Sequence, residues 1–419
     1  PWEFWRTTQF RSFEQIAPFE LRPSDDTGRA SLSALGFRLL GGVAPYLPLW
    51  LPYLAFIPLA FWIMVECIRC DEGWAGGVFL ILLASSAYFL ESLTLPYSAV
   101  GFHLLASLLV VPVSFLAFGP RPARLGFWVR VVAVAVAIHG ATLCRSSSVA
   151  MIPLVATLLL IALWRMEDQS PLPKRVMLSL VVLLVIAAPR ALAPSQAHEV
   201  WIGVWEGLGD FDRERGHEWS DFSARVALDR EGYVMARRGP YWTPETEAIF
   251  RRLVLQDVKA DPSWYARILF RRVIATLTQW RLWPTARETG LSYFPAEHPS
   301  EGYLETYYNF VTTADGFTAL GRRVEAPLWL MWIGPLWFLA SLLRGNNDRK
   351  RRRFAVVLSF ALSALLMPVV VTTLSGIEAQ ALVLGYLLCA AFMLSDLAAG
   401  LGLKVNAPGF RRRLATRHP

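Results

Sequence analysis

The sequence predicts an all-α polytopic membrane protein with one large polar domain set between its membrane helices. Three observations predict this fold class. Apolar runs close to the ~20 residues that a helix needs to cross a bilayer occur nine times. Hydrophobic residues make up 54% of the 419 positions and charged residues only 18%, whereas soluble domains usually carry about 25% charged residues. One long polar stretch, residues 195–325, separates the sixth apolar run from the seventh.

The order of apolar and polar stretches divides the chain into five parts. They are a polar segment at 1–45, six spans within 46–194, the polar domain at 195–325, three spans within 326–400 and a basic tail at 401–419. The predicted spans are 46–65, 76–93, 97–118, 127–143, 149–164, 176–193, 327–343, 354–374 and 379–398.

Basic residues predict the orientation, because lysine and arginine accumulate in cytoplasmic loops. Residues 344–353 form the strongest basic block, so we assign this loop to the cytoplasmic side. Counting spans from that block also puts Arg121, Arg165 and the arginines of the tail inside. Residues 1–45 and 195–325 then fall outside. The sequence therefore predicts a multi-pass protein whose long polar domain is extracytoplasmic.

The formal net charge of +8 does not indicate a nucleic-acid partner. Basic residues cluster beside apolar runs, where they set topology and contact anionic headgroups, and no nucleic-acid-binding module is present. Cys67 and Cys70 form a C-x-x-C pair, but no second pair or nearby histidine completes a metal site. We predict membrane lipids as partners and no cofactor. No motif indicates a divalent metal, and membrane-protein partners are compatible with the pattern.

Two helices are predicted inside the polar domain. Residues 244–258 alternate apolar and charged residues at helical spacing. Asp261 and Pro262 are typical of a helix start, with proline in the first turn. The apolar residues of the helix that they open are Trp264, Ile268, Leu269, Ile274 and Leu277, beside Arg267, Arg271 and Arg272. This pattern is typical of a helix lying on a membrane surface, and packing on its own domain is an open alternative.

Four polar residues near the outer ends of spans are candidate substrate contacts, because such side chains are costly inside a membrane. Glu91 and His103 lie in the second and third spans. They either line a polar cavity or have structural roles, as an interfacial carboxylate and a histidine bonded to a backbone carbonyl. Two arginines are predicted on the outer side of the membrane, although arginine accumulates in cytoplasmic loops. They are Arg145, in a tight outer turn, and Arg190, near the end of the sixth span. They indicate a bound phosphate or a lipid headgroup.

The polar domain opens with an aromatic and acidic run at residues 198–221. Its Trp205, Asp212 and Asp221 suit a sugar, since aromatic rings stack on the apolar face of a pyranose and carboxylates accept hydrogen bonds from hydroxyls. Tryptophan beside a membrane is also a common anchor or core residue, so both interpretations stay open. No metalloprotease, P-loop, nucleophile-elbow or dinucleotide-binding motif occurs.

Three short motifs, together with the order of the loops, carry a family resemblance. The motifs are Gly28-Arg29-Ala30-Ser31-Leu32, Leu143-Cys144-Arg145, and Trp205-Glu206-Gly207-Leu208-Gly209 followed by Gly216, Trp219 and Asp221. They resemble the GT-C superfamily of integral membrane glycosyltransferases, which includes protein O-mannosyltransferases and aminoarabinose transferases. The local sequence also resembles uncharacterised bacterial members of this superfamily. The resemblance covers most of the chain.

The resemblance implies a GT-C-like helical bundle in a bacterial inner (cytoplasmic) membrane, with a polyprenyl-phosphate sugar as donor. Residues 1–45 would then be the remnant of the first extracytoplasmic loop, and we expect a further helix upstream of Pro1. In the family that loop carries the catalytic acid. Glu3, Glu14 and Asp26 are the candidate catalytic residues here, although none stands in a clear Asp-Glu motif.

The sequence thus predicts an enzyme, a polyprenyl-phosphate-sugar-dependent glycosyltransferase that acts on an extracytoplasmic acceptor hydroxyl. Two alternatives stay open. A non-catalytic subunit of a membrane assembly could keep the same fold, because the catalytic acid is not evident. A lipid or solute transporter would carry polar residues at mid-membrane depth and show repeat symmetry, whereas here polar residues gather near the outer ends of the spans.

Overall fold

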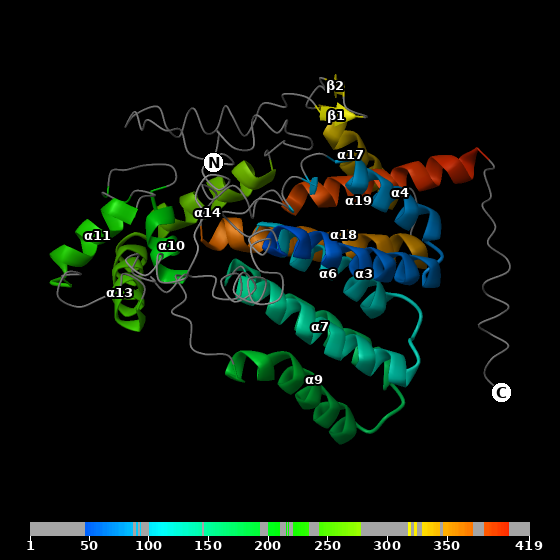
Figure 1. Ribbon diagram of the computed structural model, residues 1–419, viewed down its shortest axis with the longest axis horizontal. Helices are drawn as coiled ribbons and strands as arrows, with labels where there is room; N and C mark the ends of the chain where they lie inside the picture. Colours follow the sequence, from blue (N-terminus) through cyan, green and yellow to red (C-terminus); the bar gives the residue numbers. More distant parts are fainter. Residues whose placement is uncertain are drawn as a thin grey trace, which may run out of the picture.

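The structure, a computed structural model, is built from a membrane-type helical bundle and a smaller helical domain (Figure 1). It describes residues 47–86, 89–90, 93, 100–144, 146–192, 200–209, 215, 217, 221–233, 243–277, 317–319, 322–324, 329–343, 347–371 and 381–401. The predicted catalytic residues Glu3, Glu14 and Asp26 lie outside these ranges.

Each of the nine predicted spans overlaps a described helix. These helices are α3 (Leu47–Arg69), α4 (Gly73–Ser85), α6 (Val100–Phe118), α7 (Arg124–Cys144), α8 (Met151–Met166), α9 (Leu172–Leu192), α17 (Trp329–Leu343), α18 (Asp348–Val370) and α19 (Ala381–Gly400). Within the described residues, four helices are long and apolar enough to cross a membrane, and three more are shorter apolar helices. The chain is therefore an all-α, multi-pass membrane protein.

Two predicted boundaries are wrong. The basic block was expected to be a loop ahead of a span starting at 354, but α18 begins at Asp348, so residues 349–353 are helical. The second predicted span, 76–93, is not one helix, because α4 ends at Ser85 and the backbone of Ser86 is extended. The Ser86 carbonyl and hydroxyl then accept hydrogen bonds from the backbone N–H groups of Leu90 (3.0 Å) and Phe89 (3.2 Å), so this one residue ends one helical segment and caps the next.

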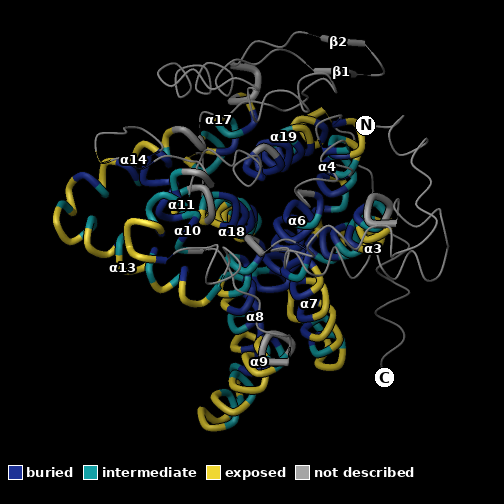
Figure 2. Tube along the Cα trace, turned by 60° about the vertical axis from the view of Figure 1, so that its left-hand side comes forward, coloured by how far each residue is buried: buried dark blue, intermediate teal, exposed yellow. Residues whose placement is uncertain are grey.

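Burial follows the position of each helix in the bundle (Figure 2). The central helix α6 packs on α3, α7, α8 and α18, and its middle is buried on all sides. The outlying helix α9 packs only along one side, on α7 and α8, and exposes leucines such as Leu180 and Leu184. Exposed leucines around a buried centre are typical of a bundle whose outer surface faces lipid.

The polar domain has its own small core. Its helices are α10 (Val200–Gly207), α11 (Asp221–Arg230), α13 (Pro244–Ala260) and α14 (Pro262–Leu277), and a hairpin pairs β1 (Phe317–Ala319) with β2 (Arg322–Val324), Phe317 opposite Val324. Both predicted helix starts are confirmed. Thr243 forms a capping box with Thr246 at the start of α13, and the Asp261 side chain accepts a hydrogen bond from the Trp264 backbone N–H (2.9 Å) at the start of α14.

The apolar face of α14 differs from the one predicted to lie on the membrane. Trp264 and Ile268 are buried in the core of the polar domain, with Phe250 and Trp205. The side chains of α14 that are exposed include Phe270, at 68%, and Ile274. For Trp264 and Ile268 the structure therefore agrees with the alternative, packing of the helix on its own domain.

The polar domain and the basic block lie at opposite ends of α18 (Figure 1). Arg272 of α14 is fully buried, and its Nη1 donates hydrogen bonds to the carbonyls of Val369 (2.9 Å) and Val370 (3.2 Å) at the C-terminal end of α18. Arg349 and Val370 are about 32 Å apart along the helix axis, close to the ~30 Å of a bilayer core. We call the two ends of the bundle the domain end and the basic end.

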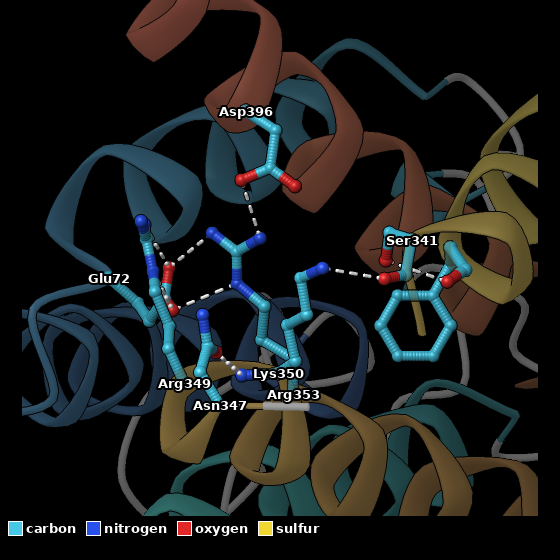
Figure 3. A network of polar contacts seen from close by, with 8 residues as sticks. Glu72, Ser341, Asn347, Arg349, Lys350, Arg353 and Asp396 are labelled. Atoms are coloured by element: carbon cyan, nitrogen blue, oxygen red, sulfur yellow. Dashed lines mark hydrogen bonds and ion pairs between the residues drawn. The ribbon is translucent and has the colours of Figure 1, made fainter. Parts of the chain in front are cut away.

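A network of ion pairs holds the basic end together (Figure 3). Glu72, in the turn between α3 and α4, is 1% exposed and accepts two hydrogen bonds from each of Arg349 and Arg353, at 2.7–3.0 Å. Arg353 also donates to Asp396 of α19 at 2.8 Å. The preceding residue, Asp71, has a positive φ of 63°. This turn places the Glu72 carboxylate against α18, and Arg353 connects it to α19 through Asp396.

Candidate functional site

The helices α7 and α9 run in the same direction and end together at the domain end. Their first halves meet α8 at the basic end, where Arg124 pairs with Glu167 (3.3 Å) and Trp164 donates to Ser179 (2.9 Å). Nearer the other end, the buried His139 donates from Nε2 to the Ile186 carbonyl at 2.7 Å. This hydrogen bond joins α7 to α9 near the domain end.

The two predicted phosphate contacts follow the residues of this contact in the sequence. Arg190 is in α9, four residues beyond Ile186, which is about 6 Å along the axis. Arg145 follows Cys144, the last residue of α7, and precedes the 3₁₀ helix η3 (Ser146–Ala150); it lies outside the described residues. The backbone of Arg190 thus lies about one turn beyond the interhelical contact, toward the domain end.

His103 lies in the first turns of α6 at the domain end and is fully buried. Glu91 lies outside the described residues, between Leu90 and Leu93, which are described. The Tyr53 hydroxyl of α3 donates to the Leu90 carbonyl at 2.7 Å. A side chain at Gly101 would come within 2.9 Å of the Leu93 backbone, so α6 can approach this segment only with glycine there. The chain beside Glu91 therefore packs on the start of α6.

Trp205 packs inside the polar domain. Its side chain is 5% exposed and its ring lies 5.3 Å from that of Phe250 and 5.0 Å from that of His217, measured between centroids. This geometry favours the core alternative over direct stacking on a sugar. Of the two carboxylates predicted with it, Asp221 is the first residue of α11, and Asp212 lies outside the described residues.

Sequence reasoning did not single out two polar contacts in this domain. His217 Nε2 lies 3.0 Å from Asp257 Oδ2, and its ring lies near those of Trp205 and Trp264. Glu247 of α13 accepts a hydrogen bond from the Trp201 backbone N–H (3.1 Å) at the start of α10. Burial raises the pKa of Glu247 to about 7, although hydrogen bonds from the backbone of Trp201 and Ile202 lower it in part. Both partners are about 40 residues away or more, beyond any local pattern.

The C-x-x-C pair is part of the packing of the bundle. Cys67 and Cys70 are both buried and not disulfide-bonded. The Cys70 thiol donates to the Phe115 carbonyl at 3.7 Å, and a side chain at Gly119 would collide with that sulfur. Among the described residues, no group of three or more histidine, cysteine, aspartate or glutamate side chains could hold a metal ion.

Comparisons with known proteins give few relatives. No protein-family model matches the sequence, and no curated protein matches it. A solved structure of the archaeal oligosaccharyltransferase AglB from Archaeoglobus fulgidus, in complex with an inhibitory peptide and a dolichol-phosphate, is similar over 95% of this chain and 47% of its own, with 13% identity and a TM-score of 0.42. ArnT from Cupriavidus metallidurans, bound to undecaprenyl phosphate, is similar over 91% of this chain and 70% of its own, with 15% identity and a TM-score of 0.30. The chain spans about half the length of the AglB chain.

The described part of the domain end includes one of the two arginines predicted to bind phosphate. Arg190 is in the last turn of α9, and Arg145 comes directly after α7 in the sequence. Arginine can bind a phosphate with two parallel hydrogen bonds, which lysine cannot do.

Proposed function

We propose that the protein is an integral membrane glycosyltransferase. It moves a sugar from a polyprenyl-phosphate donor to an acceptor hydroxyl on the side of the membrane that holds the polar domain. The observation that supports the proposal is the His139–Ile186 contact, which joins α7 to α9 near the domain end. Arg190 is in the last turn of α9, and Arg145 follows α7 in the sequence. The GT-C resemblance of the sequence supplies the reaction.

The proposed reaction needs a cationic site and a carboxylate base. Arg145 and Arg190 neutralise the donor phosphate, which leaves as polyprenyl phosphate when its bond to the anomeric carbon breaks. The acceptor oxygen forms the new bond to that carbon from the opposite side, so the configuration inverts. Its proton passes to a carboxylate, for which Glu3, Glu14 and Asp26 are the candidates.

The remaining predicted residues surround this site in the proposal. Glu91 and the buried His103 line a polar hollow at the start of α6, the cavity that the sequence predicts as one of their two alternative roles. Asp212 and Asp221 accept hydrogen bonds from the hydroxyls of the sugar. Trp205 acts indirectly, because its buried ring supports the start of the polar domain. The polar domain caps the hollow and selects the acceptor.

Binding of the donor lipid tests the proposal first. The purified full chain is titrated with a long-chain polyprenyl phosphate in neutral detergent, and bound lipid is counted by native mass spectrometry. Arg145→Gln and Arg190→Gln should each weaken binding by about tenfold, because each removes charge-assisted hydrogen bonds to the phosphate. Arg121→Gln makes the same charge change at the basic end and should leave binding unchanged. Equal effects of all three substitutions would contradict a specific phosphate site.

Transfer is then measured with a panel of polyprenyl-phosphate sugars, as release of polyprenyl phosphate. Replacing the catalytic acid among Glu3→Gln, Glu14→Gln and Asp26→Asn should slow turnover by about 10²–10⁴-fold, with lipid binding intact. A chain that binds the lipid and releases none with any donor would instead be the non-catalytic subunit. Normal turnover in all three variants would exclude these residues as the base.

A further inference from the structure

A second group of arginines lies at the basic end, away from the proposed active site. Arg69 of α3 donates to the carbonyls of Phe115 (3.1 Å) and Pro120, and Arg165 of α8 donates to that of Ala117. Arg352 of α18 donates to the carbonyl of Cys70 at 3.3 Å. Arg69 and Arg165 thus direct guanidinium groups to the C-terminal end of α6, and Arg352 directs one to the adjacent C-terminal end of α3, where unpaired helix carbonyls favour cations.

The charges in this group are not all balanced by carboxylates. Arg69 pairs with Glu66 at 2.6 Å, and the nearby Arg121 pairs with Asp168. Within the described part of the chain, Arg165 and Arg352 have carbonyl partners but no carboxylate partner, and the buried Nε of Arg352 has no hydrogen-bond partner.

The guanidinium groups of this cluster also lie close enough to repel one another. Arg121, Arg69 and Arg352 all act electrostatically against the charge of Arg165. Repulsion among clustered cations is relieved when an anion binds between them. Arg165 and Arg352 therefore keep free hydrogen-bond donors in a field that attracts negative charge.

The neighbours of these arginines place them at headgroup depth. Each lies within two residues of a large apolar side chain that is at least 40% exposed: Ile68 before Arg69, Trp164 before Arg165 and Phe354 after Arg352. The Trp164 indole N–H donates to the Ser179 hydroxyl, and Arg175 lies over the ring, 5.4 Å from its centroid. Exposed tryptophan beside arginine is typical of the boundary between acyl chains and headgroups.

We propose that Arg165 and Arg352 form a binding site for the phosphate group of an anionic phospholipid in the leaflet at the basic end. The acyl chains lie against the exposed apolar side chains, and the two guanidinium groups donate to the phosphate oxygens. The neighbouring Arg349 and Arg353 take no part, because Glu72 and Asp396 together already neutralise them. The site holds a structural or regulatory lipid, distinct from the proposed donor site about one bilayer thickness away.

The test measures retention of phosphatidylglycerol against phosphatidylcholine by the purified full chain, again by native mass spectrometry. The wild type should retain phosphatidylglycerol in preference to phosphatidylcholine. Arg165→Gln with Arg352→Gln should weaken phosphatidylglycerol binding by about tenfold or more. Arg124→Gln with Lys174→Gln is the matched control, since it removes the same charge at the same end from two surface residues that already pair with Glu167. The control should change binding by less than about threefold.

Two further measurements distinguish loss of lipid binding from loss of folding. Arg165→Lys with Arg352→Lys retains the charge and should lower binding by only about threefold, which separates loss of hydrogen bonds from loss of folding. Circular dichroism reports helix content for every variant. Equal retention of the two lipids by the wild type, or an equal loss in the control, would overturn the proposal in favour of unspecific attraction. Displacement of phosphatidylglycerol by millimolar inorganic phosphate would assign the site to a soluble anion instead.

Discussion

The two ends of α18 hold their arginines in opposite ways. At its N-terminal end, Arg349 and Arg353 face the positive pole of the helix dipole, which disfavours them, and the buried Glu72 offsets this with four charged hydrogen bonds. At its C-terminal end, Arg272 needs no carboxylate from α18, because the helix carbonyls and the negative pole favour a cation. At the basic end the acceptor is therefore a carboxylate that a substitution can remove, whereas at the domain end the acceptors are backbone carbonyls.

Removing Glu72 should have the largest effect on stability. Glu72→Ala leaves Arg353, which is 5% exposed, with Asp396 as its one remaining carboxylate partner among the described residues. The free energy of unfolding should therefore fall by about 3–5 kcal/mol. Thermal denaturation in detergent, followed by size-exclusion chromatography, gives the measurement. The control Asp168→Asn breaks the exposed pair with Arg121 and should cost about 1 kcal/mol or less. Equal losses in both variants would show that the buried network is no more than a surface ion pair.

Arg272 should matter less for the bundle and more for the docking of the polar domain. Arg272→Ala removes both hydrogen bonds to α18 and should cost about 2–3 kcal/mol. Hydrogen exchange should rise in α14 and in the last turn of α18, while the basic end stays protected. Arg272→Lys should restore part of the protection, and Arg267→Ala, on the exposed side of α14, should change little. Uniform deprotection of the whole chain would contradict a local docking role.

The sequence predicts what depends on local pattern. Apolar runs identify all nine bundle helices, and Pro262 after Asp261 identifies the start of α14, since both signals lie within a few residues. The break at Ser86 was missed because its apolar neighbours continue the run through the position where the backbone becomes extended. Polar caps inside an apolar run give no change in hydrophobicity.

Contacts between distant segments could not be predicted. Arg353 and Glu72 are 281 positions apart in the sequence. Glu247 and Trp201, which form a hydrogen bond at the start of α10, are 46 positions apart. The burial of Trp264 and Ile268 also depends on partners outside α14, because an amphipathic pattern does not say whether lipid or protein covers the apolar face. For the candidate site, the sequence indicates which residues sit near span ends, while the His139–Ile186 hydrogen bond that joins α7 to α9 is seen only in the structure.

The two regions should also respond to pH in opposite directions. At the basic end, burial raises the pKa of Glu72, but hydrogen bonds from Arg349 and Arg353 outweigh this and hold it below its usual 4.5. A carboxylate with a lowered pKa stabilises the folded state when the pH is above its usual pKa. This stabilisation is lost as the pH falls through the lowered pKa. In the polar domain, the raised pKa of Glu247 stabilises the folded state below about pH 4.5. This stabilisation is lost as the pH rises to about 7.

The smallest predicted effect follows from this difference. Between about pH 5 and about pH 8, Glu247 loses its proton on the folded domain, so the start of α10 should become less protected from hydrogen exchange, after correction for the intrinsic pH dependence. Glu247→Gln keeps a side chain that can accept from the Trp201 N–H but cannot ionise, so protection in the variant should not change with pH. The amides around Glu72 serve as the internal control, since that carboxylate stays ionised over this range. A pH response that persists in Glu247→Gln would assign the titration to another group.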